Sequence, residues 1–403
     1  MSTTAAQPLF PAARAPQCPF NPSPEYAGWR AEEGLRKVSW NGHSVWAVSR
    51  FEDIKAAMTD PRISAEALAL QSNGAHEGPN APEIFARMDD PEHARLRRML
   101  TKDFTVKRVD ALRPQIQEMA DGFIDAMIEK GAPADLVQDY ALPIPSLVIS
   151  LMLGVPYKDH DFFQTITATM MNMHTPREEK AQASREFFGY MMELVARKER
   201  EPEDDLMSRV VHEHVLTGEL RRETAAMNGV ILLNAGHETT ANMISLSTAA
   251  LLENPRMADR LVTCEDPRQL ANAIEELLRY LTIVHSLVAR VAKEDLELGG
   301  QQIKAGEGLI MNLPAGNWDP AFTEQPELLD LDRKARGHLA FGHGVHQCLG
   351  QTLARAELQI ALPTLLRRLP GLRLAVPLEE ISFRNDMSIY GVHELPLTWD
   401  SAN

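Results

Sequence analysis

One run of residues near the end of the sequence combines a thiol with glycines and imidazoles, and it reads FGHGVHQCLG from Phe341 to Gly350. Its cysteine, Cys348, directly precedes a segment with helical spacing from about Leu349 to Leu369, and backbone N–H groups at a helix start favour a thiolate. A thiolate is an axial ligand for haem iron that favours O–O cleavage. The three glycines of the run would let the backbone turn tightly beneath a flat macrocycle.

Two other interpretations of this run stay open on the residues alone. Cys348 could be one more buried free cysteine, which is the usual state of such residues. His343, His346 and Cys348 could instead hold zinc, although no second Cys/His cluster completes a structural zinc site.

A polar stretch also interrupts a long apolar helical segment, Arg222 to Asn254, which would reach roughly 50 Å at about 1.5 Å per residue. Residues 234–240 read NAGHETT, and polar groups in a buried helix are costly unless they serve a purpose. Gly236 and a threonine bonded to a carbonyl one turn earlier can open the helix ladder. The groove could then hold dioxygen and a water, and Glu238 beside Thr239 suits general-acid proton delivery.

Two further pairs share a helical face and are weak signals alone. Glu276 and Arg279 are three residues apart near the end of the segment Pro267–Tyr280, and His93 and Arg97 are four residues apart. Pairs of this kind are commonly solvated surface groups.

Taken together and in this order, the four motifs resemble those of the cytochromes P-450, the haem-thiolate monooxygenases. They are HARLR at 93–97, AGxETT at 235–240, ExxR at 276–279 and FxxGxHxCxG at 341–350, and the resemblance spans about Pro19 to Trp399.

The resemblance implies haem b (iron protoporphyrin IX) with Cys348 as the thiolate ligand, and O2 activated through Glu238 and Thr239. It also implies that His93, Arg97, Arg290 and His346 bind the haem propionates by charge-assisted bonds. Further cofactor contacts are expected from Ala235, Phe341 and Gly350. Glu276 and Arg279 are assigned to structure.

Two places depart from the family pattern. Asn317-Trp318-Asp319-Pro320 stands where Asn-Arg-Asp-Pro is usual, and Pro326-Glu327-Leu328-Leu329 stands where Pro-Glu/Asp-Arg-Phe is usual. The usual third partner of the Glu276–Arg279 pair is therefore missing from its expected place, and Arg333 could substitute.

The segments that the family places over the haem predict a large, adaptable, apolar substrate pocket, because they are rich in methionine. They are 68–84, 169–174, 231–234, 283–288 and 387–389. Residues expected to line the pocket are Met171, Ile231, Asn234, Val288 and Ile389. The Gly-, Asn- and Pro-rich segment Gln71–Pro82 fits a mobile substrate entrance.

Hydrophobic periodicity predicts a mainly α fold with a small β portion, a single-domain cytochrome P-450 fold with haem between the long helix and the Cys-loop helix. Residues 1–25 are expected to be an extended Pro-rich segment and residues 26–403 one haem-thiolate monooxygenase domain. Asn41-Gly42 predicts a hairpin between two short strands. Further short strands are expected around 296–303 and 309–312 and in the tail, 372–399. Helices are expected at 51–59, 91–103, 109–129, 145–153, 159–173, 178–200, 204–216, 222–254, 256–262, 267–280 and about 349–369.

Composition limits the partners. The net charge of −15 argues against nucleic acid and anionic lipid, and no span is long enough for a membrane. Three cysteines at unrelated spacings form no disulfide framework, so we expect a cytoplasmic protein. No nucleotide-binding Gly-x-Gly-x-x-Gly follows a strand. The resemblance therefore implies a ferredoxin and ferredoxin reductase, with NAD(P)H as the electron source, and we expect a monomer.

A basic segment offers a surface for an acidic ferredoxin. Between His93 and Arg108 it contains Arg95, Arg97, Arg98, Lys102, Lys107 and Arg108 against one acid, Asp103. Leaving Arg97 to the haem, the other five are candidates for docking, and a plain solvated helix face is the alternative.

The function expected is insertion of one oxygen atom into an apolar small molecule, such as hydroxylation of a natural product. The alternatives are a peroxide-using or nitric-oxide-reducing haem-thiolate enzyme, or a non-catalytic haem-binding protein.

Overall fold

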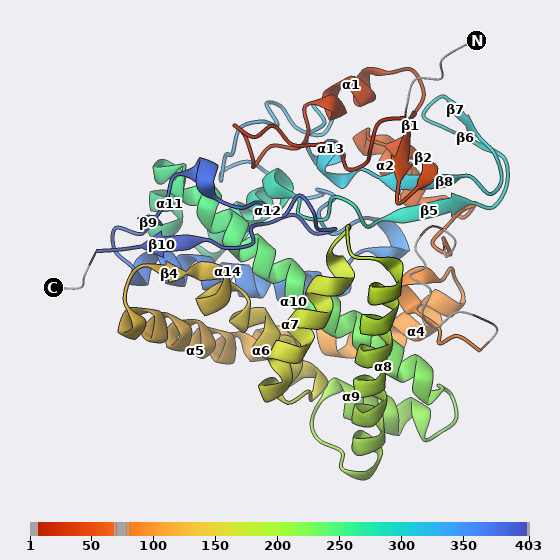
Figure 1. Cartoon of the computed structure of the whole chain (residues 1–403), viewed down its shortest axis with the longest axis horizontal. Helices are drawn as coiled ribbons and strands as arrows, with labels where there is room; N and C mark the ends of the chain where they lie inside the picture. Colours follow the sequence, from red (N-terminus) through yellow and green to blue (C-terminus); the bar gives the residue numbers. More distant parts are fainter. Residues whose placement is uncertain (1–6, 68–69, 71–77, 79, 401–403) are drawn as a thin grey trace. The chain divides into compact units, whose positions relative to one another are not determined.

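The computed structural model describes residues 7–67, 70, 78 and 80–400 (Figure 1). The chain divides into two compact units, each described by itself. The first unit comprises Met1–Ser72, Asn272–Cys348 and Ser388–Tyr390. The second comprises Asn73–Ala271, Leu349–Met387 and Gly391–Asn403. The predicted boundary at residue 25 stays a prediction.

Most of the regular structure is helical, which confirms the predicted fold class of mainly α with a small β portion. Helices in the first unit are α1 (Glu25–Ala31), α2 (Phe51–Thr59), α13 (Leu313–Asn317) and most of α12 (Pro267–Leu281), which begins in the second unit. Helices in the second unit are α4 (Glu92–Thr101), α5 (Val106–Lys130), α6 (Pro143–Leu153), α7 (His160–Met171), α8 (Arg177–Arg200), α9 (Leu206–Val210), α10 (Arg222–Leu252), α11 (Pro255–Val262) and α14 (Gln351–Arg368).

The strands of the first unit form a five-stranded sheet in the order β1-β2-β8-β5-β3 and a separate β6–β7 hairpin. Their bounds are β1 (Arg36–Trp40), β2 (His43–Val48), β3 (Ile63–Ser64), β5 (Ala289–Ala292), β6 (Leu296–Leu298), β7 (Gln301–Ile303) and β8 (Gly308–Met311). Asn41 (φ 50°) and Gly42 (φ 79°) make the predicted β1–β2 turn, as a hairpin with positive φ at both central positions requires. In the second unit β4 (Ala134–Asp135), β9 (Arg373–Leu374) and β10 (Pro396–Thr398) form the order β4-β10-β9.

Residues 7–24 pack onto the first unit and contain no helix before α1. Phe10 donates its backbone N–H to the Ser39 carbonyl (2.9 Å), and Ser39 donates to the carbonyl of Pro8 (2.9 Å). Phe10 and Tyr26 belong to an apolar cluster that also includes Trp40. The segment is therefore held by its own apolar side chains and by the edge of β1.

Helix α10 forms the core of the second unit and contacts α6, α8 and α14 (Figure 1). A Cβ on Gly236 would lie 2.7 Å from the Ile149 side chain of α6, and a Cβ on Gly229 would lie 2.4 Å from Met191 of α8. Both glycines therefore permit close helix packing. For Gly236 this is a packing role, whereas the sequence pointed to an opening of the helix, and α10 runs through the motif as uninterrupted α-helix.

A fully buried lysine fixes the connection between α8 and α9. Lys198 is 0% exposed, and its ammonium pairs with the carboxylates of Glu203 and Asp205. Asp205 also caps α9 by accepting the Ser208 N–H (2.7 Å). The turn between α8 and α9, residues 202–206, is thus built around one internal cation.

Most predicted helices are confirmed, with differences at their ends. The predicted helix 204–216 is α9 followed by a π-helical turn, Val211–Val215. The prediction missed α1, α13, β3, β4 and β5. The proposed entrance, Gln71–Pro82, lies largely outside the described residues, since 71–77 and 79 are not among them. Over the described residues, no helix has the length and apolarity needed to span a bilayer.

Candidate active site

The cysteine run forms a closed loop in the first unit. Cys348 donates its backbone N–H to the Phe341 carbonyl (2.9 Å), and a 3-10 turn, Gly344–His346, lies between them. Gly342 and Gly344 both have φ of 71°, and a Cβ on Gly344 would lie 2.6 Å from the backbone oxygen of Met58 in α2. These two positions therefore need glycine, as predicted. Gly350 has φ of −83°, so its backbone conformation is open to other residues.

The side chains of this loop fit a haem in chemical type. Cys348 is exposed, and sulfur is a suitable axial ligand for haem iron. Val345 is 56% exposed and the Phe341 ring is half-buried, so apolar surface for a macrocycle accompanies the thiol. Helix α14 begins at Gln351, two residues later than predicted, so Cys348 precedes the helix without belonging to its first turn. Among the described residues no three His, Cys, Asp or Glu side chains are placed to hold a metal ion. His343, His346 and Cys348, the zinc alternative, therefore do not form such a group.

Glu276 and Arg279 form the buried pair that the sequence assigned to structure. Both side chains are 0% exposed, and Arg279 donates from Nε to Glu276 Oε2 (2.7 Å) and from Nη2 to Oε1 (2.9 Å). Arg279 Nη1 also donates to the carbonyls of Asn317 (3.1 Å) and Pro326 (3.0 Å). The pair therefore joins α12 to the end of α13 and to the loop that contains Pro326.

Arg333 contacts the same carboxylate, which confirms it as a third partner. Its Nε donates to Glu276 Oε1 (3.1 Å). Trp318, the first departure, donates its indole N–H to the Tyr280 carbonyl (2.9 Å). At the second departure the Leu328 side chain is 50% exposed, but its carbonyl accepts from Arg279 (3.4 Å) and Arg333 (3.2 Å).

In the second unit, α10 presents an accessible stripe within an otherwise buried helix. Ala235 is exposed, whereas Ile231 and Thr239, four residues to either side, are half-buried. Thr239 Oγ1 donates to the Ala235 carbonyl (2.7 Å), which is the predicted bond to a carbonyl one turn earlier. Small and hydroxyl side chains therefore share one face of the helix.

Glu238 faces a different environment from its neighbour Thr239. It is 4% exposed, and its Oε2 accepts from Arg384 Nη1 (2.7 Å) and Asn242 Nδ2 (3.2 Å). Arg384 also donates to Asn242 Oδ1 (3.0 Å). Sequence reasoning missed Arg384, because a single arginine 146 positions from Glu238 gives no spacing signal.

The sequence matches the Cytochrome P450 family over residues 35–263 and 268–375. The chain belongs to the cytochrome P450 family. It is 50% identical to cytochrome P450-SU2 of Streptomyces griseolus, over 96% of each chain. It is also similar to the crystal structure of CYP105P1 in complex with filipin I (TM-score 0.91, 42% identity, covering 98% of this chain and 100% of that one). A third similar protein is the mycinamicin VIII C21 methyl hydroxylase MycCI of Micromonospora griseorubida (TM-score 0.90, 36% identity, covering 97% and 100%).

As a cytochrome P450, the protein is a haem-thiolate monooxygenase that uses dioxygen and electrons derived from NAD(P)H. This agrees with the expected fold, enzyme class and cofactor. The residues assigned to these roles stay predictions, and the structure adds their surroundings.

Candidate propionate partners of this cytochrome P450 lie in both units. In the second unit His93 is 1% exposed on α4, its Nδ1 lies 3.1 Å from Asp90 Oδ1, and Arg97 is half-buried one turn later. In the first unit Arg290 is 7% exposed on β5, and His346 is half-buried in the Cys loop. Each unit therefore holds one histidine and one arginine of the predicted set.

The predicted pocket residues differ in exposure. Met171, Ile231 and Val288 are half-buried, whereas Asn234 (7% exposed) and Ile389 (2% exposed) are buried. Asn234 Oδ1 is buried without a hydrogen-bond partner among the described residues. A buried amide oxygen without a partner can accept a hydrogen bond from a substrate group or from a water.

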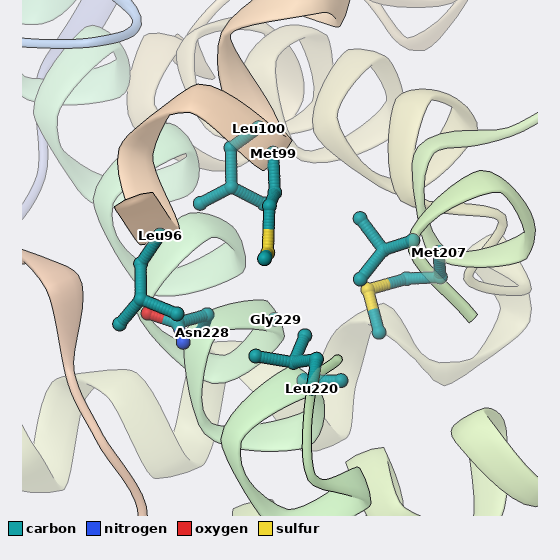
Figure 2. A pocket seen from close by; sticks show the side chains of 9 residues that line it. Leu96, Met99, Leu100, Met207, Leu220, Asn228 and Gly229 are labelled. Carbon is teal, nitrogen blue, oxygen red and sulfur yellow. The ribbon is translucent and has the colours of Figure 1, made fainter. Parts of the chain in front are cut away.

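The small internal cavity in Figure 2 is not a substrate pocket of this cytochrome P450. Its volume is about 10 Å³, at the lower limit for a single water. Side chains of α4 and α10 and their neighbours line it: Leu96, Met99, Leu100, Met207, Val210, Leu220, Ala225, Asn228 and Gly229. The amide of Asn228 already bonds the carbonyl of Thr224 (2.8 Å) and the N–H of Phe85 (3.1 Å), so it offers little to a ligand.

A buried acid that sequence reasoning missed lies beside Thr240, the last residue of the AGxETT motif. Glu357 of α14 is 1% exposed, and burial raises its pKa to about 8, although a hydrogen bond from Thr240 opposes this. Its helical neighbours at i±4, Leu353 and Ala361, are both buried. An acid between two apolar residues at this spacing is the signal that could have found it.

Proposed function

We propose that Cys348 is the thiolate ligand of the haem in this cytochrome P450. The proposal is supported by an accessible sulfur in a loop closed by its own backbone and by apolar neighbours, Phe341 and Val345. Bound haem supplies the oxidising chemistry that inserts one oxygen atom of O2 into a substrate. The remaining cofactor contacts are proposed for Ala235, Phe341, Gly350, and the propionate partners His93, Arg97, Arg290 and His346.

Thr239 and Glu238 have different parts in proton delivery in this proposal. The Thr239 hydroxyl lies on the accessible stripe of α10, where it can hold a water or hand on a proton. Glu238 is buried and ion-paired, so its carboxylate must exchange protons by way of a change in its contact with Arg384. Residues 26–403 act as one catalytic domain in this proposal.

The substrate is proposed to be an apolar small molecule of natural-product type. Support comes from the relatives that bind filipin I and hydroxylate a methyl group of mycinamicin VIII. The half-buried Met171, Ile231 and Val288 would contact its apolar surface, and Asn234 Oδ1 would accept a hydrogen bond from a hydroxyl group or a water.

Electrons are proposed to come from a ferredoxin that docks on the exposed side chains of Arg98, Lys107 and Arg108, the basic surface. Two of the other predicted docking residues already form ion pairs, Arg95 with Glu83 (3.2 Å) and Lys102 with Glu213 (2.9 Å). The acid of the segment, Asp103, is paired with Arg209, so the basic surface is left with net positive charge. Such surfaces act mainly on association rate.

A charge reversal tests the docking proposal. Changing both Lys107 and Arg108 to Glu should raise the KM for a surrogate bacterial ferredoxin about tenfold at low salt, and the difference should shrink as salt is added. Lys334→Glu, an exposed lysine in the first unit, is the control. An unchanged KM would contradict the proposed surface.

The haem proposal is tested by spectroscopy and turnover. Wild-type protein should give the ferrous carbonyl spectrum of a thiolate ligand, and Cys348→Ser should lose it, while Cys18→Ser and Cys264→Ser keep it. With mycinamicin VIII as the probe, isotopically labelled dioxygen should add one labelled oxygen atom to a product. A globin-like carbonyl spectrum in the wild type would overturn the proposal.

A further inference from the structure

Two predicted pocket residues belong to one ribbon of the first unit. The ribbon consists of residues 283–288 and 388–390, and it contains Val288 and Ile389. Ile389 forms an antiparallel bridge with Val284, and Tyr390 donates its backbone N–H to the Ile283 carbonyl (2.8 Å). A displacement of one part of this ribbon therefore moves the other.

Two aromatic side chains of the ribbon are buried and contact each other. Tyr390 is 1% exposed and His285 is 5% exposed, and their ring centroids are 5.5 Å apart. Trp40 of β1 donates its indole N–H to Ser286 Oγ (2.9 Å). The ribbon is thus fixed by side chains that point into the first unit.

The N-terminal chain holds the same tyrosine by its ring and by its hydroxyl. The Arg14 guanidinium carbon lies 3.7 Å from the centroid of the Tyr390 ring, and the Tyr390 hydroxyl donates to the Pro19 carbonyl (2.7 Å). Arg14 Nη1 donates to the carbonyls of Phe20 (3.3 Å) and Asn21 (3.0 Å). Residues 14–21 therefore close around Tyr390.

The Arg14 cation on the Tyr390 ring has no carboxylate within ion-pair distance in the described part of the chain. Burial lowers the pKa of its guanidinium. Its charge is instead balanced by backbone carbonyls and by the face of the ring, an arrangement that strengthens as water is excluded. This planar contact has a defined geometry, so it fixes where the ring of Tyr390 lies.

We propose that Arg14 is a positioning residue for the substrate pocket, acting through Tyr390 on the ribbon that contains Val288 and Ile389. The proposal rests on the proposed function, because that function makes the ribbon a pocket wall. It gives the Pro-rich N-terminal chain a part in selecting substrates without any contact between Arg14 and substrate. A misplacement near 1 Å, caused by a mutation far from the reacting atoms, can lower a reaction rate about a hundredfold.

The test compares Arg14→Met with a matched variant, Arg30→Met. Arg30 is also half-buried in the first unit, and its Nη1 donates to the Ala315 carbonyl (2.9 Å) without touching Tyr390. Two iron-binding probes distinguish an effect on the pocket wall from an effect on the haem. Imidazole is small, whereas the phenyl ring of 4-phenylimidazole extends towards the walls. Hydrogen exchange of residues 283–290 and 388–391 gives a second readout that needs no turnover.

Arg14→Met should weaken 4-phenylimidazole binding about tenfold relative to imidazole, and it should speed exchange in the ribbon. Arg14→Lys should recover part of both effects, because it restores the charge without the planar group. Unchanged exchange and an unchanged ratio of the two affinities would overturn the proposal, and so would equal changes in Arg30→Met. A globin-like carbonyl spectrum in the wild type would contradict the proposed function alone, since the exchange result still decides whether Arg14 holds the ribbon.

Discussion

The carboxylate of Glu238 and the guanidinium of Arg384 form an ion pair at 2.7 Å inside the second unit. Both side chains are largely withdrawn from solvent, and Asn242 hydrogen-bonds both members. The backbone at Gly391 approaches Asn242 so closely that a Cβ there would lie 1.9 Å from Asn242 Oδ1. The predicted proton donor is thus held by a polar network away from the Thr239 stripe.

Arg384→Met should destabilise the fold by about 3 kcal/mol, because it leaves the Glu238 carboxylate buried without its cation. The double variant Glu238→Gln/Arg384→Met should recover most of that loss, since it removes the uncompensated charge as well. Denaturant unfolding of Arg384→Met, Glu238→Gln and the double variant measures the coupling. Simple additivity of the two single effects would contradict a direct pair.

Thr239→Ala should uncouple electron use from product formation, because it removes the hydroxyl bonded to the Ala235 carbonyl on the accessible stripe. Product formed per NAD(P)H should fall about tenfold or more, with peroxide or water made instead. Thr248→Ala is the control, because Thr248 makes the same kind of bond to the Ile244 carbonyl (2.8 Å) on the same helix. Full coupling in Thr239→Ala would argue against a part in proton delivery.

Arg333→Ala should lower the free energy of unfolding by about 2 kcal/mol and increase haem loss on dilution, because Glu276 loses one of its two guanidinium partners. Arg336→Ala, at an exposed arginine nearby, should stay within about 0.5 kcal/mol of wild type. Equal stability of the two variants would show that Arg333 does not replace the missing family partner.

Glu357 should make the protein less stable as the pH rises. Its pKa of about 8 in the folded state lies above the ordinary value of 4.5, so between these values the folded state binds more protons than the unfolded state. The free energy of unfolding therefore falls with rising pH across this window and levels off above about pH 8.

Denaturant unfolding of wild type and Glu357→Gln from pH 5 to 8 checks this dependence. The amide variant should show a shallower fall, because it has no proton to lose at this position. Glu379→Gln, at an exposed carboxylate, should follow the wild-type curve. Parallel curves for wild type and Glu357→Gln would contradict a protonated acid in the folded state.

Features encoded over a few neighbouring positions could be predicted from the sequence. The closed loop around Cys348, the Thr239 bond to Ala235 and the Asn41-Gly42 turn are of this kind, because local spacing alone determines which groups meet. Even Arg333 could be found, since a missing partner near Glu276 limits the search to adjacent loops.

Features that depend on distant parts of the chain could not be predicted. Arg384 pairs with Glu238 although 146 positions separate them, and Arg14 contacts Tyr390 near the other end of the chain. Neither arginine lies in a sequence motif that indicates its partner. The position of Gly236 against Ile149 likewise depends on how α6 and α10 pack, which hydrophobic periodicity does not specify.

The internal ammonium of Lys198 makes the α8–α9 junction a natural reporter of local opening. An amine with no solvent contact cannot meet a water-borne acylating reagent until the Glu203–Asp205 turn lifts away from α8. The rate at which Lys198 is acylated in the intact protein therefore measures how often this junction opens. Peptide mass spectrometry gives that rate, with the exposed amine of Lys107 as the reference.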